Sequence, residues 1–410
     1  MKCRVGLRKV SLFVFLCIYS SLFASKATSS VIKIYLDADR TRHFASARSI
    51  EMGVKTAFAE VNNTIQGRRV EFVMTDHRAN SSRSKLNMQR AFSDPDTLLV
   101  IGGMHSPPLI KNRAFINERK MLTLVPWAAG GPITRYPSED NWIFRLSIDD
   151  TKAGFVIAEY AVKKRQCENP HLILEQTPWG ESNRKTMSKA LLASLQKEPA
   201  VTWFNWGISD ANFRIKLRSI LASKADCLLF VGNSNDGETL AKAILSIEEA
   251  RVLPVLSHWG ITGGSFHKAI TAKQRASMDL TFIQTCFSFV SSAQTELSRN
   301  VFASAQTMFS DITTATSLKA PAGFIHAYDL SRLLIQGLSQ ITLTESMDTN
   351  RAALKEALEQ LQQPVQGLVK RYDKPFSTYR VENEDAHEAL SVDDFCMAKF
   401  GEKNEILLMD

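Results

Sequence analysis

The chain has 410 residues, of which 44% are apolar and 22% are charged, a composition typical of a globular protein large enough for two domains. Its formal charge is +8, but residues 1–27 carry five cations and no anion, so that without them the charge falls to +3. The remaining chain is only weakly basic, and nucleic acid is therefore not indicated as a partner.

Residues 1–27 have the pattern of a secretory signal peptide. They begin with four cations, Lys2, Arg4, Arg8 and Lys9. An apolar run over 10–23 follows, and Ser25-Lys26-Ala27 offers small residues for cleavage. The apolar run is shorter than the roughly 20 residues that span a bilayer, which disfavours a membrane anchor. The pattern therefore predicts an exported, cleaved chain.

Strands and helices are expected to alternate through the first part of the chain. Strands are predicted at 31–36 and 70–74, and in the apolar runs that begin at Leu98 and Met121. Helices are predicted at 47–61, from Asn80 or Ser81 to about Phe92, and at 108–120. Each strand stops abruptly at small or polar residues, which is typical of strands buried on both faces of a parallel sheet.

The same alternation restarts near residue 150. Strands are expected at 142–145, 171–175, 201–206, 227–231, 255–258 and 280–287, with helices from Ala153, at 212–222 and at 238–249. Helices then dominate to about Leu361, and the tail over 377–409 is β-like, with a hairpin turn at 401–403. The pattern predicts an α/β protein with two similar lobes, each a doubly wound parallel sheet with right-handed crossovers.

A ligand site is expected where the strands end. Ligands of open parallel sheets bind outside the carboxyl ends of the strands, so Ser106 should lie beside Ala128-Ala129. Backbone N–H groups there could face an anion, while Ser106 could instead cap the following helix. Three tryptophans, Trp127, Trp179 and Trp259, also fall at predicted strand ends. They would either stack on a flat or cationic ligand or pack between the lobes.

The cysteine spacing and the absence of catalytic motifs from the sequence argue against a metalloprotein and against an enzyme. After the leader four cysteines remain, Cys167, Cys227, Cys286 and Cys396. They could pair in an oxidising compartment, but buried free thiols are slightly favoured because Cys227 and Cys286 lie in apolar runs. No C-x-x-C or metal-like Cys/His cluster is present in the sequence, so no metal or cofactor is expected. Because the sequence also lacks a nucleophile elbow, an H-E-x-x-H motif and a dinucleotide fingerprint, an enzyme is not expected.

Seven short motifs follow one another in an order that resembles a known family. They are Ala57-Phe58-Ala59-Glu60-Val61-Asn62, Val100-Ile101-Gly102-Gly103 leading to Ser106, Pro126-Trp127-Ala128-Ala129, Phe144-Arg145-(x)4-Asp150, Trp179-Gly180, Asp210-(x)2-Phe213 and Asp385-Ala386-His387-Glu388. From about Val31 to the C-terminus, the chain resembles the type I periplasmic binding proteins. Among these it looks like the branched-chain amino-acid group of the substrate-binding proteins of ABC transporters.

The resemblance implies two lobes joined by a hinge of three crossing strands. The first lobe would take residues 31–149 and 288–368, and the second would take 150–287 and 369–410. The ligand would lie between the lobes, which would close on it.

The resemblance also implies which residues hold the ligand. Family members that bind amino acids hold the carboxylate with a Ser and a Thr; Ser106 matches the Ser, and Ala129 stands in place of the Thr. Asp150 matches one ammonium-binding acid, whereas Trp259 stands in place of the other and Trp179 in place of a Tyr. The expected ligand-binding residues are His105, Ser106, Trp127, Ala128, Ala129, Asp150, Trp179, Asn233, Ser234 and Trp259. The incomplete pattern for a zwitterion favours an aromatic or amine-bearing solute over a plain branched-chain amino acid.

The function that follows from the resemblance is solute capture. A monomeric periplasmic protein would bind a small polar or aromatic solute and deliver it to an inner-membrane ABC permease. The alternative is a ligand-sensing partner of a membrane receptor such as a histidine kinase, because both functions use the surface of the closed lobes.

Overall fold

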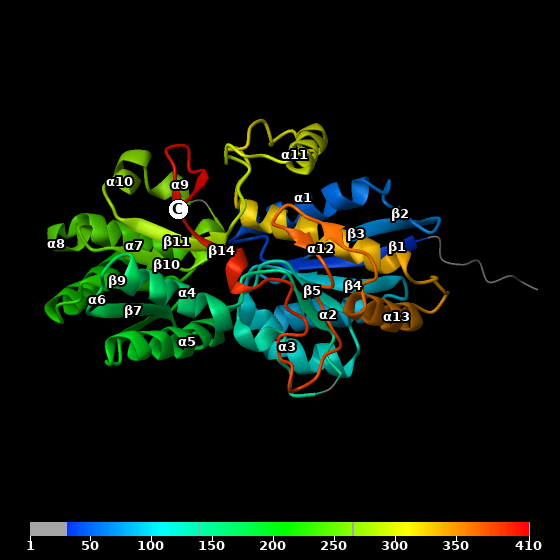
Figure 1. The fold of residues 1–410 in the computed structure, drawn as a ribbon, viewed down its shortest axis with the longest axis horizontal. Coiled ribbons are helices and arrows are strands. Elements are labelled where there is room, and N and C mark those ends of the chain that lie inside the picture. Colours follow the sequence, from blue (N-terminus) through cyan, green and yellow to red (C-terminus); the bar gives the residue numbers. More distant parts are fainter. Residues whose placement is uncertain (1–30, 139, 265, 410) are drawn as a thin grey trace, which may run out of the picture.

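The computed structural model describes residues 31–138, 140–264 and 266–409, so the expected signal peptide and its cleavage site lie outside the described residues. Two α/β lobes lie side by side, each built on its own sheet (Figure 1). This confirms the predicted fold class. Among the described residues, no helix is both long and apolar enough to span a membrane.

The first sheet has six strands in the order β2-β3-β1-β4-β5-β6. Their bounds are β1 (Val31–Ala38), β2 (Thr64–Ile65), β3 (Arg68–Asp76), β4 (Thr97–Gly102), β5 (Thr123–Val125) and β6 (Ile143–Arg145). All pairs are parallel except the short β2–β3 pair. Every residue of β4 is buried, as the unbroken apolar run from Leu98 predicted.

Helices cover both faces of the first sheet. They are α1 (Phe44–Ala59), α2 (Ser81–Ser93), α3 (Ser106–Glu118), α11 (Glu296–Met308), α12 (Pro321–Ser339) and α13 (Met347–Glu359). Successive residues of β1 point to opposite faces: Ile34 joins a cluster with Ile50 of α1, and Tyr35 joins one with Met88 of α2. Both faces are therefore covered by apolar residues, and the ends of the strands are the expected place for a ligand.

The second sheet has seven strands in the order β15-β14-β11-β10-β9-β7-β8. Their bounds are β7 (Pro170–Glu175), β8 (Ala200–Phe204), β9 (Cys227–Val231), β10 (Val255–Ser257), β11 (Leu280–Thr285), β14 (Phe395–Phe400) and β15 (Ile406–Leu408). The first five are parallel, whereas β14 and β15 form an antiparallel hairpin on β11. The tail, which was predicted to be β-like from residue 377, forms strands of the second sheet only from Phe395 onward. Residues 377–390 pair with no strand of that sheet.

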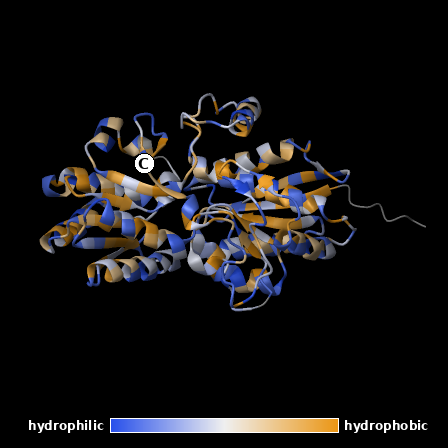
Figure 2. Cartoon of the chain, in the orientation of Figure 1, coloured by the Kyte–Doolittle hydropathy of each residue, from blue (hydrophilic) through white to orange (hydrophobic). Residues whose placement is uncertain are grey.

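The helices of the second lobe again cover both faces. They are α4 (Asp150–Lys163), α5 (Pro178–Leu195), α6 (Asp210–Ala222), α7 (Ser234–Ser246), α8 (Glu248–Arg251), α9 (Phe266–Ala269) and α10 (Ala272–Ala276). Leu172 of β7 belongs to the same apolar cluster as Met187 of α5, whereas its neighbour Ile173 belongs to another cluster with Leu217 of α6. The two residues therefore point to opposite faces of the sheet. Figure 2 shows hydrophobic and hydrophilic residues alternating along these helices, as expected for elements with one buried face.

The chain crosses between the lobes at three places. It leaves the first sheet after β6 to enter α4, leaves the second after β11 to enter α11, and returns before β14. On this last passage His387 stacks on Phe144 of β6, with ring centroids 3.7 Å apart, so the segment before β14 packs on the first sheet. The exact lobe boundaries at 149/150, 287/288 and 368/369 stay a prediction.

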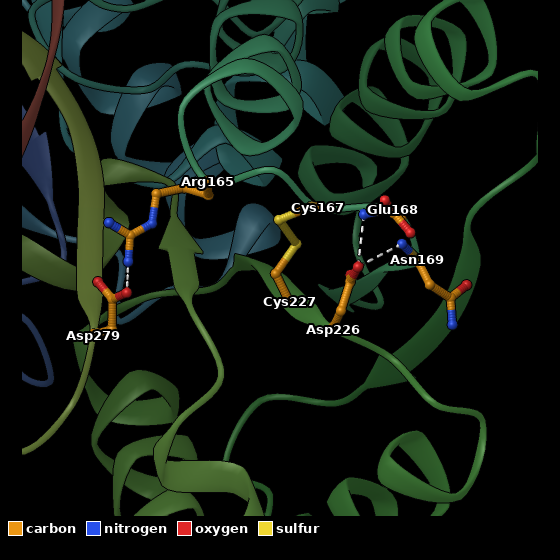
Figure 3. The surroundings of a disulfide bond; sticks show 7 residues. All are labelled: Arg165, Cys167, Glu168, Asn169, Asp226, Cys227 and Asp279. Atoms are coloured by element: carbon orange, nitrogen blue, oxygen red, sulfur yellow. Dashed lines mark hydrogen bonds and ion pairs between the residues drawn. A yellow bond between two sulfur atoms is a disulfide. The ribbon is translucent and has the colours of Figure 1, made fainter.

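The four cysteines are joined as two disulfides, Cys167–Cys227 and Cys286–Cys396. The expectation of buried free thiols is therefore wrong. An apolar environment accommodates a disulfide-bonded cysteine as well as a free thiol. The burial of Cys227 therefore could not show which of these two forms is present. Figure 3 shows Cys167–Cys227 beside Asp226, which accepts hydrogen bonds from the backbone of Glu168 and Asn169 at 2.6 and 2.9 Å. Both bridges lie within the second lobe.

Candidate ligand site between the two sheets

The carboxyl ends of the two sheets meet. Trp127, which follows β5, lies against Trp259, which follows β10, with ring centroids 5.7 Å apart. Nearby, the backbone N–H of Gly131 in the first lobe donates to Ser182 Oγ of α5 at 3.2 Å. Gly263 of the second lobe also lies close to the end of the Met104 side chain, because a Cβ added there would lie 2.8 Å from its Sδ and Cε atoms. The structure thus holds the strand ends of both lobes in contact.

Asp150 lies at this junction, where it begins α4, and it is fully buried. Its Oδ1 accepts a hydrogen bond from Trp179 Nε1 at 3.2 Å and lies 3.0 Å from His258 Nε2. Trp179 in turn meets the His258 ring edge to face, with centroids 5.0 Å apart. Asp150, Trp179 and His258 therefore form one polar cluster at the ends of the second sheet.

Several buried polar atoms at this junction have no partner among the described residues. They are Asp150 Oδ2, Ser234 Oγ and His258 Nδ1. A buried polar atom left unpaired costs about 1–3 kcal/mol, so such atoms usually mark a bound water or ligand. The three atoms lie on α4, on α7 and after β10, which places them where a polar solute would gain hydrogen bonds.

An open cleft of about 420 Å³ lies next to this junction. It is lined by Arg42, His43 and Ala79 from the first lobe and by Trp206, Gly207, Asn233, Asn235 and Asp236 from the second. This volume lies within the range of small-molecule sites in proteins. The cleft has an aromatic ring and amide groups on one wall and cationic and imidazole groups on the other.

Two acidic side chains support the wall from the second lobe. Glu175, at the end of β7, accepts from Trp206 Nε1 at 2.7 Å and from Asn233 Nδ2 at 3.2 Å. Its complete burial raises its pKa to about 8, so at neutral pH it mostly keeps its proton. Burial also raises the pKa of Asp236, which accepts from Gly207 N at 2.9 Å. A cationic ligand beside Glu175 would favour the charged form of its carboxyl group.

Three side chains meet behind the other wall. Asp39 Oδ2 lies 3.0 Å from His43 Nδ1 and 3.3 Å from His105 Nε2, and the two ring nitrogens are 3.2 Å apart. Burial lowers the pKa of His105 to about 3, so its imidazole is neutral. The ring of His105 lies 5.4 Å from the ring of Trp206, which reaches it from the second lobe.

The ten residues expected to bind ligand are all buried near the junction. Of these, Asn233 lines the open cleft, while Asp150, Trp179, Trp127 and Trp259 make the contacts just described. Ser106 does not cap α3, because His105 holds the N-cap position; instead Ser106 Oγ accepts from Gly130 N at 3.0 Å. Whether any of the ten touches a solute stays a prediction.

Sequence reasoning missed three groups near the cleft: the Asp39–His43–His105 cluster, Trp206 and Asp236. His105 is 62 residues from His43 and 66 from Asp39, so no local motif joins them. The spacing Asp39-(x)3-His43 after a strand was the one available signal. Trp206 and Asp236 follow β8 and β9 by a few residues, where the strand-end rule could have found them.

Comparisons with known proteins agree with this architecture. A family model described as "Periplasmic binding protein" matches residues 40–387. No curated protein matches the chain.

Solved structures have the same fold at low sequence identity. A type 1 periplasmic binding protein from Bordetella pertussis Tohama I has a TM-score of 0.76 at 16% identity, covering 92% of this chain and 99% of its own. A leucine-binding protein from Thermotoga maritima gives 0.74 at 16%, covering 92% and 98%. A solute-binding protein of an ABC transporter from Rhodopseudomonas palustris HaA2, in complex with p-hydroxybenzoic acid, gives 0.72 at 15%, covering 92% and 95%.

Proposed function

Since this chain belongs to the periplasmic binding protein family, we propose that it captures a small solute between its two lobes and delivers it to an inner-membrane ABC permease. It works in the periplasm as a monomer, by binding and not by catalysis. The two lobes are 31–149 with 288–368 and 150–287 with 369–410, and they open and close about the crossing segments.

The observation that carries this proposal is the group of unpartnered polar atoms where the strand ends meet. Asp150 Oδ2, Ser234 Oγ and His258 Nδ1 are buried at the junction without partners among the described residues. In a protein that served only as a scaffold, these positions would be apolar or paired, because an unpaired group destabilises the fold. A solute that pairs with them would be bound tightly and would hold the lobes together.

The chemistry of the junction favours an aromatic or amine-bearing solute. Trp127, Trp179 and Trp259 offer flat faces to a ring or a cation, each contact contributing about 0.5–2 kcal/mol for a cation. Asp150 supplies a buried carboxylate for an ammonium group. Three of the structural neighbours were solved with p-hydroxybenzoic acid, 4-hydroxybenzoate or benzoate, which are flat ring compounds, and two with isoleucine or Leu.

A thermal-shift screen of ligand-free, refolded protein tests this function. Amino acids, amines, amides and aromatic carboxylates are added at millimolar concentration. A true ligand at one hundred times its Kd stabilises the native state by about 2.7 kcal/mol, which raises the melting temperature by several degrees. An aromatic or amine-bearing compound should give this rise, and leucine, isoleucine and valine should not. If no compound raises the melting temperature, the proposed function is wrong; a rise with leucine alone overturns the ligand class.

A further inference from the structure

Asp39, His43 and His105 direct three ligand atoms toward one point. Asp39 Oδ2, His43 Nδ1 and His105 Nε2 form a triangle with sides of 3.0, 3.2 and 3.3 Å. Ligands about 2.0 Å from a tetrahedral zinc ion lie about 3.3 Å from one another, so the triangle has the size of one face of a metal site. All three side chains are buried, and no other cluster of this composition is present among the described residues.

The carboxylate is oriented so that one oxygen is left for the shared point. Asp39 Oδ1 accepts from the backbone N–H groups of Thr41 and Arg42 at 3.2 and 2.9 Å. Its Oδ2 faces only the two imidazoles. Backbone hydrogen bonds of this kind commonly fix the carboxylate ligand of a metal ion.

The two histidines occupy positions where histidine is not the usual choice. His43 and His105 hold the N-cap positions of α1 and α3, and neither side chain caps its helix. Ser, Thr, Asp or Asn would cap those helices with a gain of about 1 kcal/mol. The imidazoles turn to Asp39 instead, so these residues give up helix capping for a contact with the carboxylate.

Hydrogen bonding alone leaves the cluster incomplete. If both imidazoles donate to Asp39, then His43 Nε2 and His105 Nδ1 become buried acceptors, and neither has a partner among the described residues. A metal ion would take the lone pairs of His43 Nδ1 and His105 Nε2 and leave the outer nitrogens as N–H donors, which would then need acceptors such as ordered water. The positive N-terminal ends of α1 and α3 oppose a cation, and the charge of Asp39 offsets them.

We propose that Asp39, His43 and His105 bind a divalent transition-metal ion, with Zn²⁺ as the reference ion, at the wall of the cleft. Imidazole and carboxylate ligands suit Zn²⁺ and its neighbours in the first transition row. Three protein ligands leave at least one coordination position for water or for a solute atom.

The site opens on the cleft and is distinct from the Asp150 cluster. His43 lines the cleft directly, and Trp206, which lines it from the second lobe, lies against His105. The nearby His77 is not a ligand in this arrangement, since its Nδ1 already accepts from Ala79 N at 3.0 Å. Metal binding goes beyond the proposed function and needs no organic solute. The metal site can therefore be refuted while solute capture holds, and the reverse.

Calorimetry with Zn²⁺ on the chelator-stripped, full-length protein tests the proposal. Wild type should bind one equivalent of Zn²⁺ in the absence of any solute. His43→Gln and His105→Gln should each weaken binding by about a hundredfold or more, since even residues that only support a metal ligand contribute about 10–100-fold. His171→Gln is the matched control, because His171 is a buried histidine of β7 that bonds Thr202 Oγ1 at 2.8 Å; it should keep wild-type affinity.

Two results would overturn the metal site. One is the absence of stoichiometric Zn²⁺ binding to wild type, which would leave Asp39 and its imidazoles as a hydrogen-bonded network only. The other is unchanged affinity in the two variants. If either variant fails to fold, wild type loaded with Co²⁺ decides: intense visible absorption from nitrogen ligation at low coordination number supports the site, and the weak spectrum of aqueous Co²⁺ contradicts it.

Discussion

At the residue scale, the Trp179–Asp150 hydrogen bond links an aromatic face to a carboxylate. Trp179→Phe keeps most of the buried ring but removes the 3.2 Å bond to Asp150. Since this bond orients the Asp150 carboxyl group that would meet the solute, we expect solute affinity to fall by about 10-fold or more, which is about 1.4 kcal/mol of binding free energy. Calorimetry with the compound found in the thermal-shift screen measures this loss.

The matched control for that variant is Trp142→Phe. Trp142 is 3% exposed on the first lobe, near Lys355 and away from the strand ends, so the control should lower stability without changing affinity. If Trp142→Phe and Trp179→Phe reduce affinity equally, Trp179 acts through general packing and its proposed contact with the solute is wrong.

A second residue-scale prediction concerns pH. In the folded state Glu175 keeps its proton up to about pH 8, whereas an unfolded glutamate loses it near pH 4.5. Between these values the folded state binds more protons than the unfolded state, so stability falls as pH rises, by about 1.4 kcal/mol per pH unit at most. Melting temperatures at pH 5 and pH 8 should therefore show a smaller drop for Glu175→Gln than for wild type. Equal drops would show that Glu175 ionises freely in the folded protein.

At the scale of elements, a buried ion pair ties the first and third crossings together. Arg145 of β6 donates to both oxygens of Glu388, with Nε–Oε2 and Nη2–Oε1 distances of 2.8 and 2.7 Å, and it lies 2.9 Å from Asp149. All three side chains are buried. The two motifs that carried the family resemblance at 144–150 and 385–388 are thus in direct contact.

Glu388→Gln should destabilise the protein by about 3–5 kcal/mol, because it leaves the buried Arg145 without its full counter-charge. Glu384→Gln is the control, since Glu384 is largely exposed and lies 3.8 Å from Arg135. That change should cost at most about 1 kcal/mol. Urea unfolding measures both; similar small losses for the two variants would show that the pair contributes little.

The Cys286–Cys396 disulfide fastens the tail to the second lobe. Cys396 lies on β14, opposite Gln284 of β11, and the bridge closes a separation of 110 residues. Replacing both cysteines by serine should lower stability by about 2–5 kcal/mol. Denaturant unfolding of this variant, compared with the Cys167→Ser/Cys227→Ser variant, measures it. An unchanged midpoint would contradict a stabilising role for the bridge.

The strands were the most predictable elements, because continuous apolar runs such as the one from Leu98 directly report burial on both faces. The first residues of helices were predicted less accurately than the strands. Asn80 caps α2 as predicted, but α3 begins at Ser106, two residues before the expected residue 108. Trp259 lies just past the end of β10, as expected, and there it begins a short 3₁₀ helix.

The candidate site was predicted only in part. The strand-end rule placed Trp127, Trp179 and Trp259 at the junction, because sheet geometry brings strand ends together, whereas Asp150 was expected there from the family resemblance. It could not reveal which cysteines pair or that His105 meets Asp39, since both depend on packing between segments 60 or more residues apart.

At the scale of the whole molecule, the account depends on two lobes that close on a solute. We take this structure, in which the strand ends touch through Trp127 and Trp259, as the reference for the closed arrangement. A solute that binds both lobes shifts an open–closed equilibrium by its difference in affinity for the two states.

Small-angle X-ray scattering with and without the identified solute tests this claim most directly. Ligand-free protein should have a larger radius of gyration than protein saturated with solute, and the saturated curve should match the closed structure. The same radius in both samples, with binding verified by calorimetry, would contradict capture between closing lobes.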